Sequence, residues 1–204
     1  MKKLVLLLFL LTSVLLPVEG NDDFGTWTHV QLNFNKNNFY SFVRAEYRSK
    51  DNMKAMDCWY IQPRVGYKFT SWLKTDVGYY FYKTPSSTEH RPYVSVAGTL
   101  KQENLSVSLR ERYVYEYNAT EKTSENVLRS QLKAQYDIPK SIFSPYVAVE
   151  VYTWKKWQKT RHYVGTQLNV SRNVSFDLYY MYYSFDGKPS EHVLGAGLIF
   201  DLNL

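Results

Sequence analysis

Beyond Gly20, apolar and polar side chains alternate along this chain in segments of about ten residues, almost to the last residue. Side chains on a β-strand point to opposite faces with a period of two, so each segment predicts a strand with one apolar and one polar face. A chain made only of such strands must close its sheet or protect its edges, because an open edge exposes unpaired backbone groups. Inside a bilayer the closed solution is a transmembrane β-barrel.

Residues 1–20 have the composition of a secretory signal peptide. Two lysines follow Met1, an apolar stretch covers residues 4–16, and small residues precede the expected cleavage after Gly20. The apolar stretch is shorter than the ~20 residues that a membrane-spanning helix requires. We therefore expect an exported protein in which residues 21–204 form a single barrel domain.

The alternating runs define the expected strands. They lie at about 26–35, 39–49, 58–69, 73–83, 91–101, 105–117, 126–137, 144–154, 159–170, 174–184 and 191–203. Many are longer than an ordinary soluble strand and match a membrane-spanning one. The predicted fold class is all-β, a transmembrane antiparallel up-and-down barrel of about 10–12 strands. A bacterial barrel usually has an even strand number, so we expect that one run is not a wall strand or that a twelfth strand is hidden.

Three features favour a membrane barrel over a soluble one, which alternation alone does not distinguish. Connections at one end look short, as at 35–38 and 171–173, whereas those at the other end look longer, as at 84–90 and 118–125. The last strand ends in alternating apolar residues, like the terminal strand that bacterial barrel-assembly machinery recognises. Aromatic residues collect at both strand ends, as interfacial girdles do, and this set is Tyr40, Trp59, Tyr60, Phe69, Trp72, Tyr113, Tyr115, Tyr117, Tyr136, Trp154, Trp157, Tyr179, Tyr180, Tyr182 and Tyr183. These features indicate the outer membrane of a Gram-negative bacterium.

The polar faces carry a charged network that we assign to the lumen. It comprises Arg44, Glu46, Arg48, Arg64, Arg110, Arg112, Arg129, Lys133, Glu150, Arg161 and Asp177. The network is either a plug of salt bridges that seals the barrel, or a narrow path for a small anionic solute, which the excess of arginine favours. Glu111 falls on the apolar face between Leu109 and Tyr113, so we expect a β-bulge to turn it inward or an interfacial position for it.

A second group of residues is predicted to contact lipid at the barrel rim. This group is Trp154, Lys155, Lys156, Trp157 and Lys159, which combines aromatic and cationic side chains where lipopolysaccharide phosphates would lie. Solvated loop charge is the other interpretation. The basic residues form no clustered patch, which argues against nucleic-acid binding.

No catalytic or metal motif emerges from the sequence. Outer-membrane lipid hydrolases use a His and a Ser two residues apart, so that both lie on one face. Ser190 and His192 have this spacing in reverse order, with Glu191 on the opposite face, and we assign no catalytic residue there. The histidines are dispersed and Cys58 is the only cysteine, so no metal site or cofactor is expected.

Several short motifs together resemble one bacterial family. They are Asp23-Phe24-Gly25-Thr26-Trp27, Arg129-x-Gln-x-Lys133, Ser144-Pro145-Tyr146 followed by Glu150, Arg161-His162-Tyr163-Val164-Gly165, and Leu194-Gly195-Ala196-Gly197-Leu198. The chain is similar over nearly its whole mature length to the outer-membrane barrels classed as domain of unknown function 2490. The resemblance implies the fold and the location, and it implies no catalytic residues.

The sequence favours a non-enzymatic envelope protein, either a narrow channel or a structural component with a charged lumen. Two alternatives stay open: a membrane-embedded lipid-modifying enzyme, and a soluble secreted β-barrel binding module. The expected partners are outer-membrane lipid and lipopolysaccharide, the assembly machinery during insertion, and a small solute if the lumen conducts.

Overall fold

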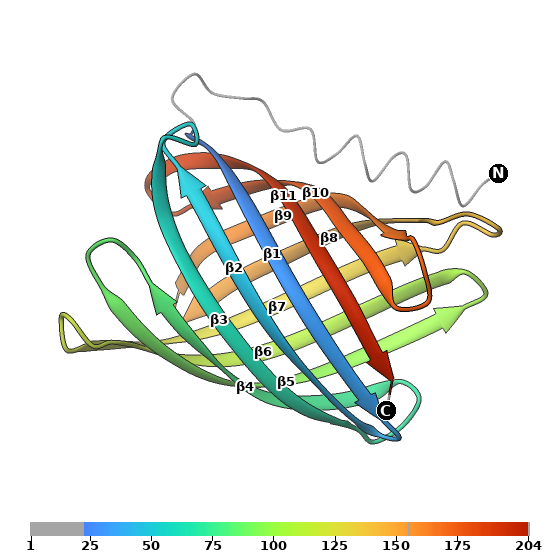
Figure 1. The fold of residues 1–204 in the computed structure, drawn as a ribbon. Coiled ribbons are helices and arrows are strands. Elements are labelled where there is room, and N and C mark those ends of the chain that lie inside the picture. The colour runs from blue at the N-terminus through green and yellow to red at the C-terminus, as the bar shows by residue number, and fades with distance from the viewer. Residues whose placement is uncertain (1–22, 155, 204) are drawn as a thin grey trace.

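The chain folds into one closed β-barrel (Figure 1), seen in a computed structural model that describes residues 23–154 and 156–203. The eleven strands of this part are β1 (Asp23–Lys36), β2 (Phe39–Lys50), β3 (Ala55–Lys68), β4 (Leu73–Lys83), β5 (Thr88–Gln102), β6 (Leu105–Asn118), β7 (Thr123–Tyr136), β8 (Phe143–Trp154), β9 (Lys156–Asn169), β10 (Val174–Phe185) and β11 (Lys188–Asn203). The all-β barrel prediction is confirmed. The predicted signal peptide lies outside the described residues. Within them, no helix is long and apolar enough to cross a membrane.

Strand order follows the chain around the barrel, and consecutive strands pair antiparallel. The barrel closes between β1 and β11, which run parallel from Asp23↔Glu191 to Asn35↔Asn203 (Figure 1). An odd number of antiparallel strands leaves the first and last strands pointing the same way, so closure requires one parallel ladder. The expectation of a non-wall run or a hidden twelfth strand is wrong for the described residues, because all eleven strands lie in the wall.

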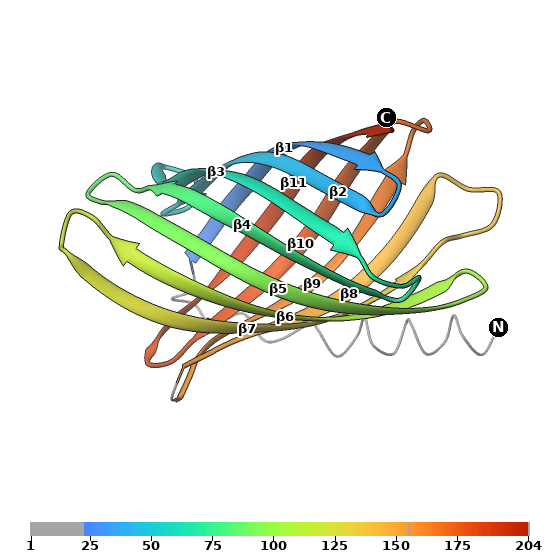
Figure 2. The same ribbon diagram turned by 90° about the horizontal axis from the view of Figure 1, so that it is seen from below.

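The two faces of the sheet differ in polarity as the alternation predicts. On β1 the outward Val30 and Leu32 are exposed, whereas His29 and Gln31, which alternate with them, point inward and are buried. The strands are tilted, so those of the near wall cross those of the far wall in Figure 2, as closure of a sheet into a barrel requires. An apolar outer wall around a polar interior suits a bilayer, and a soluble barrel would have the reverse arrangement.

The connections at the two ends of the barrel do not differ in length as predicted. At the end where longer connections are predicted, the connections include residues 51–54, 84–87 and 119–122. At the other end they include residues 69–72, 137–142 and 170–173, which are of similar length or longer. The backbone ladders continue into segments that look like loops from their polar side chains, for example at Lys83↔Thr88 and Asn118↔Thr123. Ladder hydrogen bonds join backbone groups, so polar side chains do not end a strand.

The aromatic residues form outer girdles at both ends, but several predicted members are not part of them. Exposed outer aromatics gather near the start of β1 (Tyr47, Tyr113, Tyr115, Trp154, Trp157) and near its end (Phe39, Phe69, Trp72, Phe143). Tyr40 and Tyr183 are instead buried, and Tyr60, Tyr179 and Tyr183 line the interior cavity. These tyrosines are at strand positions whose side chains point inward. Whether a side chain points inward depends on the alternation and not on how near it is to the strand end.

Glu111 stays on the outer wall. The registers Val96↔Glu111 and Glu111↔Ser130 run without interruption, so the predicted β-bulge is absent. The exposed carboxylate accepts a hydrogen bond of 2.6 Å from Ser130 Oγ. Register shifts occur elsewhere, at Arg48/Ser49, Tyr152/Thr153 and Tyr183/Phe185.

Candidate functional site

The interior of the barrel holds a cavity of about 470 Å³. All eleven side chains assigned to the lumen from the sequence line it: Arg44, Glu46, Arg48, Arg64, Arg110, Arg112, Arg129, Lys133, Glu150, Arg161 and Asp177. They come from β2, β3, β6, β7, β8, β9 and β10. The site is therefore built from most of the wall, and closure of the barrel is what brings its parts together.

Glu150 is the centre of the largest ion-pair network. Its side chain is only 1% exposed. Arg110 on β6 and Arg129 on β7 form ion pairs with its carboxylate, with Nη2 to Oε1 distances of 2.6 Å and 2.9 Å. Arg161 Nη1 lies 3.5 Å away on β9, and the Tyr152 hydroxyl donates to the same carboxylate at 3.0 Å. The register places Glu150 directly opposite Arg161 and Gln131, so cross-strand pairing sets up the contacts. One carboxylate thus serves three guanidinium groups.

Two further carboxylates anchor smaller networks. Glu46 on β2 accepts hydrogen bonds from Arg48 Nε at 2.8 Å and from the Tyr60 hydroxyl at 2.6 Å, with Arg44 Nη1 at 3.7 Å.

On β4, Asp76 lies 3.5 Å from Arg64 Nη1 and accepts hydrogen bonds from the Tyr40 and Ser95 hydroxyls. Each buried carboxylate is therefore satisfied by both a cation and a hydroxyl, as burial of charge requires.

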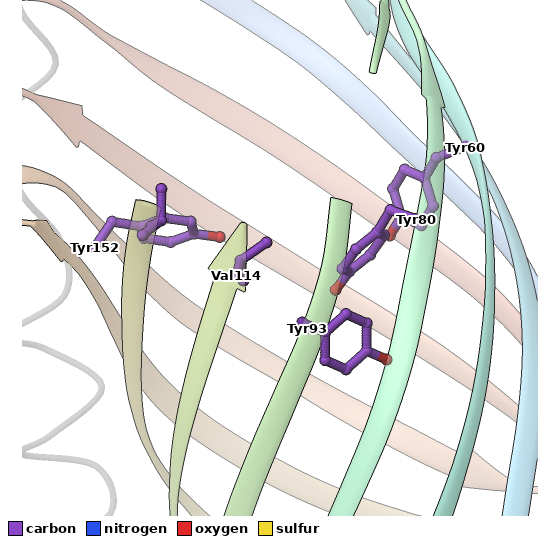
Figure 3. Close-up of a cluster of buried hydrophobic side chains, with 6 residues drawn as sticks. Tyr60, Tyr80, Tyr93, Val114 and Tyr152 are labelled. Carbon is purple, nitrogen blue, oxygen red and sulfur yellow. The ribbon is translucent and has the colours of Figure 1, made fainter. Parts of the chain in front are cut away.

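Aromatic rings hold the arginines in place. Figure 3 shows Tyr60, Tyr80 and Tyr93 close together, with Val114 on β6 and Tyr152 on β8 farther along the wall. The Arg112 guanidinium lies 4.0 Å from the Tyr93 ring centroid, and Arg48 lies 3.6 Å from that of Trp27. Stacking on an aromatic face favours a cation and limits its rotamers. The lumen charges are consequently fixed in position.

Glycines leave room for these inward rings. A Cβ at Gly78 would overlap the Tyr93 ring, and one at Gly197 would overlap the His29 ring. Both are inward positions where a neighbouring strand's side chain lies across the backbone, so only a residue without a side chain fits.

The sequence assignment missed several lumen residues, and the clearest is Arg91. Its guanidinium binds Glu89 at 2.6 Å and Glu116 at 3.3 Å. The alternation contains the signal, because Arg91 has the same parity as the inward Tyr93, but Arg91 is the first residue of the expected strand at 91–101. His29 and Gln31 line the cavity as well.

Positive charge is in excess along the cavity. Among the described residues that line it, ten side chains are basic (Arg44, Arg48, Arg64, Arg91, Arg110, Arg112, Arg129, Lys133, Lys159 and Arg161) and six are acidic (Glu46, Asp57, Glu116, Glu150, Asp177 and Glu191), while Asp76 and Glu89 pair with Arg64 and Arg91 from outside this lining. With these two carboxylates counted, the ten basic side chains still exceed the eight acidic ones.

The predicted rim group is divided by the structure. Trp154, Lys156 and Trp157 are exposed, and Trp154 packs near the outer Tyr113 ring at 6.0 Å. Lys155 lies outside the described residues. Lys159 lies inside: it lines the cavity, with its Nζ 4.8 Å from the Tyr152 ring centroid. The register passes from Tyr152↔Lys159 to Thr153↔Trp157, so one extra residue of β9 separates the outward Trp157 from the inward Lys159.

Ser190 and His192 lie on the outer face of β11. Their described hydrogen bonds go to different tyrosines, Ser190 Oγ to the Tyr182 hydroxyl at 2.9 Å and His192 Nδ1 to the Tyr180 hydroxyl at 2.5 Å. Glu191, between them in sequence, lines the cavity on the other side of the wall. Within residues 23–154 and 156–203, no three His, Cys, Asp or Glu side chains gather as a metal site would need.

Solved porins share this fold. A NanC porin superposes with a TM-score of 0.54 at 16% identity, over 83% of this chain and 90% of that one. A KdgM porin in complex with disordered oligogalacturonate gives a TM-score of 0.53 at 16% identity, over 76% of this chain and 82% of that one. No curated protein matches the sequence. The family of proteins of unknown function DUF2490 matches over residues 24–193, and the chain belongs to that family.

Proposed function

We propose that this chain is a porin-like protein of the bacterial outer membrane whose narrow lumen passes small anionic solutes. The observation that carries the proposal is the excess of basic over acidic side chains along the cavity. A pore lined by arginine and lysine lowers the energy of an anion and raises that of a cation. The apolar outer wall and its aromatic girdles support the membrane location.

The size and crowding of the lumen limit what would pass. The cavity of about 470 Å³ is shared by the Glu150, Glu46 and Asp76 networks, whose side chains reach inward from opposite walls. Such an interior suits inorganic anions and small organic acids, and it suits extended acidic chains better than bulky solutes. The likeness in fold to a KdgM porin that binds oligogalacturonate is consistent with an acidic solute.

Planar bilayer recording tests the proposal. Protein refolded to a heat-modifiable barrel is inserted, and the reversal potential is measured across a potassium chloride gradient. We expect anion selectivity that decreases in Arg129→Ala, because Arg129 lines the cavity. Cation selectivity, or no conductance from protein shown to be folded, would contradict the proposal.

A further inference from the structure

Four arginines and one carboxylate meet on the interior of β6 to β9. Arg110, Arg129 and Arg161 all have Glu150 as their ion-pair partner, and Arg112 is within its electrostatic reach. Among the described residues, no other carboxylate lies within ion-pair distance of these four guanidinium groups. This arginine cluster (Arg110, Arg112, Arg129 and Arg161) therefore keeps a local excess of three positive charges.

Arg112 is the least compensated member. It is 2% exposed and makes no ion pair in the described part of the chain. Its Nη1 donates to the Tyr80 hydroxyl at 2.6 Å, and the same oxygen lies 3.5 Å from Arg129 Nη1. A phenol oxygen thus occupies the place between two guanidinium groups where a carboxylate would be expected.

The register makes this arrangement unfavourable for the protein alone. Arg112 and Arg129 are directly opposite each other on β6 and β7, and like charges in that relation destabilise a sheet. The Nε atoms of Arg110, Arg112 and Arg161 are buried without a hydrogen-bond partner. Buried donors and buried uncompensated charge both call for a partner from solution.

We propose that the arginine cluster is a binding site for an oxyanion, namely the phosphate, sulfate or carboxylate group of a solute. The site deepens the proposed anion pathway and gives it a defined binding step. A guanidinium group presents two parallel N–H donors that match two oxygens of such a group. Stacking on Tyr93 holds the Arg112 plane in place, which limits its loss of side-chain freedom when a ligand binds.

Isothermal titration of the folded barrel in detergent with inorganic phosphate tests the site directly. We expect saturable binding to the wild-type chain and a dissociation constant at least about tenfold larger in Arg112→Gln, which loses one charge-assisted interaction. Arg91→Gln is the matched control, because Arg91 also lines the lumen but is already paired with Glu89 and Glu116. Its phosphate affinity should stay within about twofold of wild type, a difference well below a tenfold step.

Glu150→Gln gives a second and opposite readout. Removing the carboxylate that pairs with the cluster in the described part of the chain raises the local charge, so phosphate should bind several-fold more tightly to Glu150→Gln protein shown to be folded. Absence of binding to folded wild-type protein, or equal affinity in wild type and Arg112→Gln, would overturn the inference. Phosphate binding to a barrel that does not conduct would support the oxyanion site and contradict the proposed channel. Conductance without phosphate binding would support the channel and contradict the oxyanion site.

Discussion

Glu150→Gln is the substitution with the largest expected effect on stability. The carboxylate is 1% exposed and binds Arg110, Arg129 and Arg161, so the amide leaves three guanidinium groups without their counter-charge. Breaking a buried ion pair by removing one partner costs about 3–5 kcal/mol.

Two features reduce that cost here. The side chains of Arg110 and Arg129 are 23% and 14% exposed to the lumen, so water stabilises part of the released charge. Glutamine also keeps one carbonyl oxygen that accepts hydrogen bonds. We therefore expect the free energy of unfolding to fall by about 2–4 kcal/mol.

Urea unfolding in lipid vesicles, followed by tryptophan fluorescence, measures this difference. Glu111→Gln is the matched control, because Glu111 is on the outer wall with Ser130 as its described partner. We expect that variant to be as stable as wild type or more stable, since an amide is easier to place in lipid than a carboxylate. A Glu150→Gln barrel within about 0.5 kcal/mol of wild type would refute the view that Glu150 holds the lumen together.

Two further substitutions test the packing and the rim assignment. Gly78→Ala places a Cβ against the Tyr93 ring and should lower the free energy of unfolding by about 1–3 kcal/mol, measured by the same urea titration, and unchanged stability would show that the ring moves freely. Lys159→Gln should reduce anion selectivity in a salt gradient, because Lys159 lines the cavity, while the exposed Lys156→Gln should leave the reversal potential unchanged. Equal effects of the two lysine substitutions would contradict the placement of Lys159.

The residues that line the lumen were predictable wherever the sequence shows which side chains of a strand share a face. Arg44, Glu46 and Arg48 alternate with Val43, Ala45 and Tyr47, so their common face follows from a period of two. Parity fails where a ladder shifts register. The predicted rim group joins Lys159 to Trp157 as one cationic and aromatic segment, and the irregularity at Tyr152/Thr153 places the two residues on opposite faces.

Strand ends were less predictable than strand faces. The polar segments around Thr88 and Thr123 looked like loops, yet their backbones continue the ladders of β5 and β7. Side-chain polarity reports the surroundings of a residue, whereas strand length depends on backbone pairing with the neighbour. For the same reason Glu111 looked like a sign of a bulge although its register is unbroken.

Local periodicity was enough to predict the strands of an all-β barrel and to sort their residues into an apolar and a polar face, because the alternation is present in each strand by itself. The assignment of the polar face to the interior needed further features, such as the apolar terminal strand and the aromatic residues at the strand ends. Only the closed barrel decided which charges meet. Arg110, Arg129 and Arg161 come from three strands, and their shared partner Glu150 comes from a fourth. The parallel β1–β11 seam and the clustering of four arginines around one carboxylate both depend on register and tilt, which arise only when all the strands pair at once.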